Sequence, residues 1–143
     1  MPHFTSDNDI ERIGSGLIDR SLPKSDWTHA GHFAAALWII AKCPHLDAAR
    51  DMPGLIRTYN EATGVANTDA SGYHETITQA SLRAARAFLA AAPPAPLFEV
   101  CNNLMSSPLG QPDWLLTYWT RETLFSTAAR RTYTPPNKRS LPF

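Results

Sequence analysis

The chain has 143 residues, of which 43% are hydrophobic, and its 13 basic side chains are balanced by 13 acidic ones. This length and composition suit one ordinary domain with a core of its own. A formal net charge of zero provides no overall field that would attract a nucleic acid or an anionic membrane, so we expect neither partner.

The apolar runs are short, and both cysteines lie in helical patterns. Residues 33–41 form one of the longest runs, well short of the roughly 20 residues of a transmembrane helix, and no secretory signal pattern opens the chain. We therefore expect a cytoplasmic protein. Cys43 and Cys101 lack CxxC spacing and are expected to be buried free thiols.

Prolines, which are rare inside helices, divide the chain into segments. The twelve prolines leave three long proline-free segments, 24–43, 54–92 and 113–134, where we expect helices. Before these, residues 7–20 carry an amphipathic stripe of isoleucine and leucine, which predicts a first helix.

The second predicted helix carries an apolar stripe from residue 33 onward. Ser25 or Asp26 is expected to cap its N-terminus, because both side chains can accept a hydrogen bond from a free backbone N–H group. Pro44 disfavours helical backbone at the residue before it, so the helix is expected to end at Cys43.

The next segment is predicted as two short elements and a loop. A helical turn near 46–51 is followed by a helix with Pro53 in its first turn, a position where proline is well tolerated. Gly64 is well placed to stop that helix, and residues 65–72 have the composition of a loop.

The remaining chain is also predicted to be helical until its last residues. A long helix spans about 73–91, and a shorter one follows at about 97–105. Residues 113–132 form either one helix or two, because Thr120 offers a second capping site. Residues 134–143 are interpreted as an extended tail that packs on the domain. The whole chain is thus predicted to be an all-α, single-domain helical bundle of about five to seven helices with an extended C-terminal tail.

Three of the five histidines fall on the predicted inner faces of two helices. His29 and His32 lie about one turn apart near the start of the second helix, and His74 lies at the start of the helix at 73–91. Parallel packing of these helices would bring the three rings together at one end of the bundle. Three imidazoles that leave one position open can hold a catalytic transition metal, so these histidines are candidate ligands for Zn²⁺, Ni²⁺ or Fe²⁺.

A second interpretation of the same histidines needs no metal. A buried imidazole is often a polar core group that is hydrogen-bonded to a carbonyl or hydroxyl, and for a single histidine we favour that explanation. Three inward histidines shift the balance toward a shared site, because burying each ring has a desolvation cost. Both interpretations stay open.

Two glutamates are candidate general bases for metal-assisted chemistry. Glu75 follows His74 directly, and Glu122 shares a predicted helical stripe with aromatic side chains. Simpler roles are also available, since Glu75 can stabilise the N-terminus of its helix through the helix dipole and Glu122 can pair with an arginine.

Several aromatic and amide side chains flank the same region. Trp27, Tyr73 and Asn67 are candidate ligand-pocket residues, although capping and core packing explain them as well. An apolar patch that includes Trp114 and Trp119 is a candidate interface for a homo-oligomer.

Three segments resemble a family of short, uncharacterised bacterial proteins with no established reaction: WTHAGH at 27–32, YNEATGVANTDASGYHETIT at 59–78 and RETLFSTAAR at 121–130. The chain is also loosely similar to DinB-like helical bundles, in which three histidines from separate helices hold a divalent metal. That similarity implies the same three histidines as ligands here, although the separation of only three residues between the first two departs from the DinB arrangement.

The sequence lacks the motifs that identify several enzyme classes, including HExxH, paired ExxH, GxSxG, GxGxxG and a Walker loop. Two functions therefore remain, and the sequence leaves open whether the protein is an enzyme. One is metal-assisted hydrolysis or group transfer on a small molecule. The other is a non-enzymatic domain, either small-ligand-binding or structural, in which the histidines are polar core groups.

Overall fold

The computed structural model describes residues 3–143, and within that range it contains seven α-helices, three short 3-10 helices and no strand. The prediction of a single all-α domain is confirmed. The α-helices are α1 (Asp7–Asp19), α2 (His29–Lys42), α3 (Ala48–Ala62), α4 (Glu75–Ala91), α5 (Leu97–Ser106), α6 (Arg121–Leu124) and α7 (Thr127–Arg131), and the 3-10 helices are η1 (Lys24–Asp26), η2 (Pro108–Gly110) and η3 (Trp114–Thr117).

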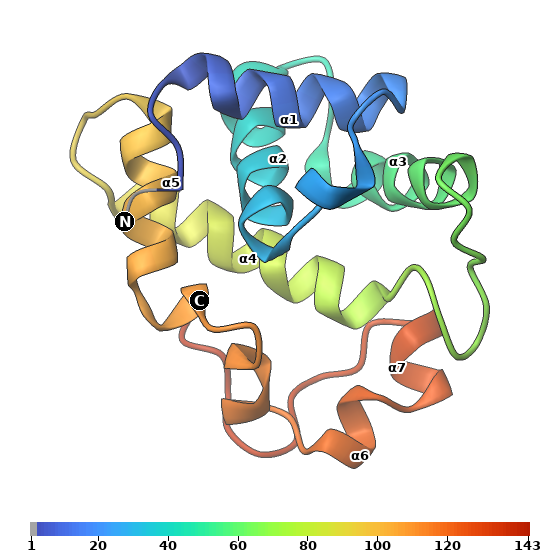
Figure 1. Ribbon diagram of the computed structural model, residues 1–143. Coiled ribbons are helices and arrows are strands. Elements are labelled where there is room, and N and C mark those ends of the chain that lie inside the picture. The colour runs from blue at the N-terminus through green and yellow to red at the C-terminus, as the bar shows by residue number, and fades with distance from the viewer. Residues whose placement is uncertain (1–2) are drawn as a thin grey trace.

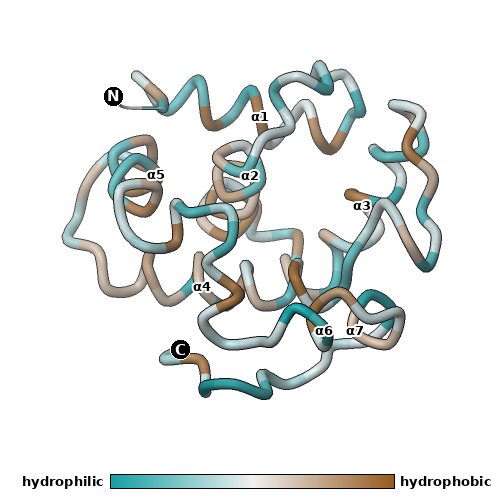
Figure 2. Tube along the Cα trace, turned by 60° about the horizontal axis from the view of Figure 1, so that its bottom comes forward, coloured by the Kyte–Doolittle hydropathy of each residue, from teal (hydrophilic) through white to brown (hydrophobic). Residues whose placement is uncertain are grey.

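Helix α2 lies at the centre of the domain, where it packs against α1, α3, α4 and α5 (Figure 1). Its sequence explains this position, because apolar side chains surround most of the helix and four of the buried ones are alanines, which let neighbouring helices approach closely. Gly14 of α1 lies directly on Trp38 of α2, where a Cβ atom would be only 2.2 Å from the indole ring. Along α1, Figure 2 shows hydrophilic and hydrophobic residues alternating around the turns, as expected for a helix with one buried face.

The start of α2 differs from the prediction. The backbone forms the short η1 helix at the predicted capping residues, and α2 begins later with Thr28 as its N-cap. The Oγ1 atom of Thr28 accepts a hydrogen bond of 3.1 Å from the backbone N–H of Gly31. Ser25 and Asp26 are therefore not the cap, because η1 uses them in a separate turn. At the other end, α2 stops at Lys42, close to the predicted position.

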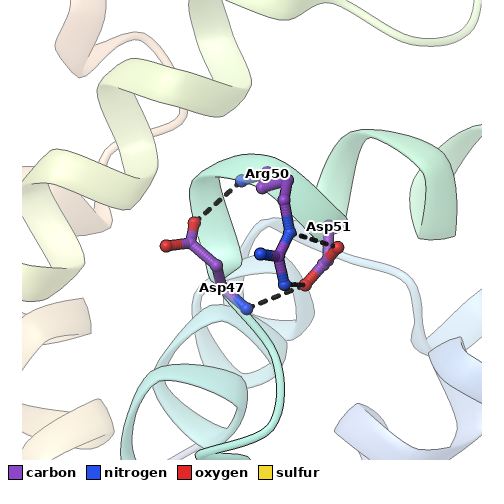
Figure 3. Close-up of polar contacts among 3 residues, drawn as sticks. All are labelled: Asp47, Arg50 and Asp51. Carbon is purple, nitrogen blue, oxygen red and sulfur yellow. Dashed lines mark hydrogen bonds and ion pairs between the residues drawn. The ribbon is translucent and has the colours of Figure 1, made fainter.

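Helix α3 is one continuous helix rather than the two elements that Pro53 suggested. Its N-terminus is fixed by a reciprocal set of hydrogen bonds (Figure 3). Asp47 is the N-cap and accepts from the backbone N–H of Arg50 at 3.0 Å, while the Asp51 carboxylate accepts from the backbone N–H of Asp47 at 2.8 Å. The Arg50 guanidinium donates to that carboxylate and helps to hold the pKa of Asp51 down at about 2.

Pro53 is tolerated inside α3 because a neighbouring helix replaces the hydrogen bond that it removes. Proline has no N–H group, so the carbonyl of Ala49, four residues earlier, has no partner within α3. The Nε2 amide of Gln79 in α4 donates to this carbonyl at 2.9 Å. The helix ends before Gly64, whose φ of +85° suits glycine, as predicted.

After α5 the chain forms several short helices instead of one long one. Thr120 caps α6 by accepting a hydrogen bond from the backbone N–H of Thr123, so the two-helix alternative is correct in its restart at this residue. The tail beyond α7 has no helix, and its Leu141 and Phe143 pack against the core. It is fastened to the 114–120 segment, where the indole N–H of Trp119 donates to the Thr134 carbonyl at 2.9 Å.

The two tryptophans of the predicted patch and the two cysteines are all buried. Trp114 and Trp119 are 5% and 0% exposed, so they belong to the core and do not form the surface patch that was considered for oligomerisation. Cys43 and Cys101 are buried free thiols, as predicted, and burial raises the pKa of Cys101 to about 12. In the part of the chain that the structure describes, no helix has the length and apolarity to cross a bilayer.

Candidate functional site

A cavity of about 450 Å³ opens between the first half of α2, the first half of α4 and the segment from residue 112 to 125. Most of its lining is aromatic or aliphatic: Trp27, Phe33, Ile77, Pro112, Trp114, Leu115, Leu116, Leu124 and Phe125. The polar lining residues are Thr28, His29, His32, Ser81, Asp113 and Arg121. Phe125 is 54% exposed, and no other large hydrophobic side chain in residues 3–143 is exposed to this degree.

His32 has a fixed orientation in this cavity. Its Nδ1 atom lies 2.7 Å from the carbonyl oxygen of Thr28. Because a carbonyl can only accept, Nδ1 carries the proton and donates it. The Trp27 ring stacks on the imidazole with 3.8 Å between ring centroids and an interplanar angle of 29°. In the neutral ring, Nε2 is therefore an unprotonated acceptor.

The surroundings of His32 favour its neutral form. The pKa of His32 is lowered to about 4, chiefly because the ring is partly removed from bulk water, with a smaller contribution from the nearby His29. The hydrogen bond to the Thr28 carbonyl acts in the opposite direction. His32 is nevertheless exposed to solvent, which limits how strongly its charge is disfavoured. The imidazole is uncharged at neutral pH.

His29 connects α2 to η2. Its Nε2 atom lies 2.9 Å from the carbonyl oxygen of Leu109 in η2, so Nε2 carries a proton and donates. The ring also meets Phe33 edge to face, with 5.2 Å between centroids and an angle of 78°. His29 therefore positions the chain that leads into η3 and contributes to the shape of the cavity.

His74 lies elsewhere and has both ring nitrogens engaged. It is the N-cap of α4, where Nδ1 accepts from the backbone N–H of Ile77 at 3.2 Å and Nε2 donates to the Leu124 carbonyl at 2.7 Å. The side chain is 7% exposed and does not line the cavity. Burial lowers the pKa of His74, and the positive charge of Arg130 contributes in the same direction.

The three candidate ligands thus do not form a common ligand set in this arrangement. Among residues 3–143, no group of three or more His, Cys, Asp or Glu side chains is placed to hold a metal ion. His29 and His32 share the cavity, whereas His74 is held at the junction of α4 and α6 by backbone groups. This geometry does not fit a three-histidine metal centre, because His74 would first have to give up both of its hydrogen bonds.

Neither candidate general base lines the cavity. Glu75 is half-buried, and its Oε1 atom accepts from the Tyr73 hydroxyl at 2.5 Å and from Gln79 Nε2 at 3.4 Å. Glu122 lies exposed in the first turn of α6. The aromatic stripe assigned to Glu122 required a continuous helix, which the break before α6 removes.

Of the three candidate pocket residues, only Trp27 lies in the cavity. Asn67 is a loop anchor, since its Oδ1 atom accepts from Asn60 Nδ2 and from the backbone N–H of Tyr73, both at 3.0 Å. Tyr73 is buried beneath Arg57, whose guanidinium carbon lies 4.6 Å from the phenol centroid. Asn67 and Tyr73 line a separate surface hollow beside the 65–72 loop.

Several cavity residues were not singled out as site residues from the sequence. Ser81 lies on the same face of α4 as Ile77, and that shared stripe was the available signal. Trp114, Arg121 and Phe125 enter the site because the segment from residue 112 to 125 borders the same cavity as the first half of α2. No periodic pattern marks them, because they belong to helices of only about one turn.

Comparisons with known proteins provide no family for this chain. No family model matches it, and no curated protein and no solved structure gives a match. The resemblances to short bacterial proteins and to DinB-like bundles therefore stay predictions.

Proposed function

We propose that this protein is a small-ligand-binding helical domain whose site is the cavity beside Trp27 and His32. The observation that carries the proposal is the apolar cavity of about 450 Å³ with a stacked indole–imidazole pair on its wall. This volume falls within the range of about 300–1,000 Å³ that is usual for pockets that bind small molecules. The apolar lining favours a ligand with an aromatic or aliphatic body.

The chemistry of the lining supports binding more than turnover. A general base works best when its pKa lies near the working pH, whereas the pKa of His32 is lowered to about 4. The acidic side chain in the lining is Asp113, which is exposed. His32 is therefore better suited to accept a hydrogen bond from a ligand than to remove a proton from one.

Binding of 8-anilinonaphthalene-1-sulfonate, an anionic fluorescent probe with an apolar aromatic body, tests the proposal. The probe is expected to bind the folded protein and to quench emission from Trp27 and Trp114, which line the cavity. Ser81→Phe fills the cavity from α4 and is expected to weaken binding severalfold. Thr58→Phe, at an exposed position of α3, is the matched control and is expected to bind like the wild type.

Two outcomes would contradict the proposal. One is the absence of probe binding to a protein that unfolds cooperatively, and the other is equal binding by Ser81→Phe and Thr58→Phe. Elemental analysis of the untagged protein after metal supplementation tests the metal-dependent alternative. Stoichiometric metal that is lost in both His29→Ala and His74→Ala would favour a metal centre over a simple binding pocket.

A further inference from the structure

We propose that the cavity selects flat aromatic molecules that carry one N–H or O–H donor, and that the Nε2 atom of His32 accepts this hydrogen bond. The inference deepens the proposed binding function and rests on it. It adds the chemical class of the ligand and the residue that distinguishes that class from molecules of the same shape.

The tautomer of His32 is fixed by the backbone around it. Thr28 is held in place as the N-cap of α2, and its carbonyl accepts both the backbone N–H of His32 at 2.9 Å and the imidazole Nδ1–H at 2.7 Å. The preceding turn is tightly packed, because a Cβ atom on Gly31 would lie 2.5 Å from the Asp26 carbonyl oxygen. The imidazole proton therefore stays on Nδ1, and Nε2 presents a lone pair.

The position of the imidazole makes this lone pair available to a ligand. Trp27 fixes the ring plane by stacking, and Trp27 is itself held edge to face by Tyr59, at 5.5 Å between centroids. The Tyr59 hydroxyl donates to the Leu22 carbonyl at 2.8 Å within the core. This chain of contacts places a rigid aromatic acceptor on the cavity wall, while Nε2 makes no hydrogen bond within residues 3–143.

Desolvation of Nε2 explains how the cavity would discriminate between ligands. A ligand that enters the cavity displaces the water that otherwise hydrates this nitrogen. A molecule with a donor replaces that hydrogen bond, whereas a molecule of equal shape without one leaves the acceptor unpaired. Among the other lining groups, the Thr28 hydroxyl already accepts from Gly31 and His29 donates its Nε2–H to the Leu109 carbonyl. His32 is exposed, as are Asp113 and Arg121, so the discrimination requires that the bound ligand itself cover Nε2.

Indole and benzofuran provide a matched test, because they have the same shape and differ in an N–H group replaced by an oxygen atom. In isothermal titration with the full chain at neutral pH, we expect indole to bind about two- to tenfold more tightly than benzofuran. His32→Phe keeps a flat ring beside Trp27 but removes Nε2, so the ratio of the two affinities is expected to fall to about one. His45→Phe, at an exposed position, is the matched control and is expected to keep the wild-type ratio.

A second measurement on the unmodified protein avoids dependence on the folding of a variant. The imidazole ¹⁵N spectrum is expected to show a protonated Nδ1 and an unprotonated Nε2 at His32. The Nε2 signal should shift on addition of indole, and shift much less with benzofuran.

The possible failures separate this inference from the proposed function. Equal affinity for indole and benzofuran in the wild type would overturn the inference and leave an unselective apolar pocket. Loss of discrimination in Asp113→Asn but not in His32→Phe would overturn the role of His32. Failure of both compounds to bind a protein that still binds 8-anilinonaphthalene-1-sulfonate would overturn the inference, and failure of all three would overturn the proposed function.

Discussion

Replacement of His74 by leucine tests whether this histidine is a structural junction. Two interactions would be lost, the cap on the backbone N–H of Ile77 at 3.2 Å and the bond to the Leu124 carbonyl at 2.7 Å. Loss of an N-cap costs about 1 kcal/mol. A buried carbonyl without a partner costs a further amount of about 1–3 kcal/mol. We therefore expect the free energy of unfolding to fall by about 2–4 kcal/mol.

Two further variants separate these contributions. His74→Asn keeps a side chain that can cap α4 but is too short to reach Leu124, so it is expected to lose only about 1–3 kcal/mol. His45→Leu, at an exposed position, is the control and is expected to stay within about 0.5 kcal/mol of the wild type. Urea titrations followed by circular dichroism would measure all three, with the wild type treated with and without EDTA.

The structural role of His74 predicts that EDTA leaves the wild-type unfolding midpoint unchanged. The reasoning would be refuted if His74→Leu were no less stable than His45→Leu. It would also be refuted if EDTA destabilised the wild type by as much as the His74→Leu substitution does, since stability would then depend on a bound metal.

Three more perturbations test the packing of the domain. Thr76→Val removes a fully buried hydroxyl that donates to the Ala129 carbonyl at 2.7 Å and accepts from the backbone N–H of Thr134 at 3.0 Å, so urea titration should show a loss of about 2–3 kcal/mol against exposed Thr58→Val. The free energy of unfolding should fall as the pH drops below about 6.5, because the pKa of His74 is lowered in the folded protein and the unfolded chain therefore binds the proton first. Urea midpoints measured at about pH 7.5 and about pH 5.5 would show this fall. The pH dependence should be smaller in His74→Asn. A Cβ atom at Gly54 of α3 would meet nothing within 4 Å, so Gly54→Ala should raise the free energy of unfolding by about 0.4–1 kcal/mol and should also raise the thermal midpoint. Gly72→Ala, at φ +78°, should lower both.

The helices were largely predictable because proline and apolar periodicity act locally. The segments that became α1, α4 and α5 were identified within a few residues of their observed ends. The prediction failed where a distant group replaced a local signal. Pro53 indicated a break, but Gln79 of α4 supplies the hydrogen bond that the proline removes, and no pattern near Pro53 announces that partner.

The sequence predicted only part of the candidate site. The helical period placed His29 and His32 on the same inner face of α2, and both line the cavity beside Trp27. They are not core side chains, because His29 is half-buried and His32 is exposed. The period placed His74 inward as well, and that side chain is buried. It did not show that His74 precedes the first turn of α4, where a capping side chain folds back over the helix end instead of pointing along the helical stripe. The predicted three-histidine site depended on the orientation of His74.

The three histidines share a structural role, which is not the binding of a common metal ion. Each donates one ring N–H to a backbone carbonyl, and two of these carbonyls, those of Leu109 and Leu124, lie near or at the C-terminal ends of short helices. The last carbonyls of a helix have no partner within it, and in a short helix they are a large share of all its carbonyls. A domain that packs such helices against its core must supply donors from elsewhere, and an imidazole can donate while its other nitrogen caps a helix or faces a cavity. The desolvation cost that argued for a metal is therefore offset by hydrogen bonds to carbonyls that would otherwise be unpaired. His29 and His32 each keep one ring nitrogen without a hydrogen-bond partner among the described residues, and of the two it is the stacked ring of His32 that we propose as the acceptor for a ligand.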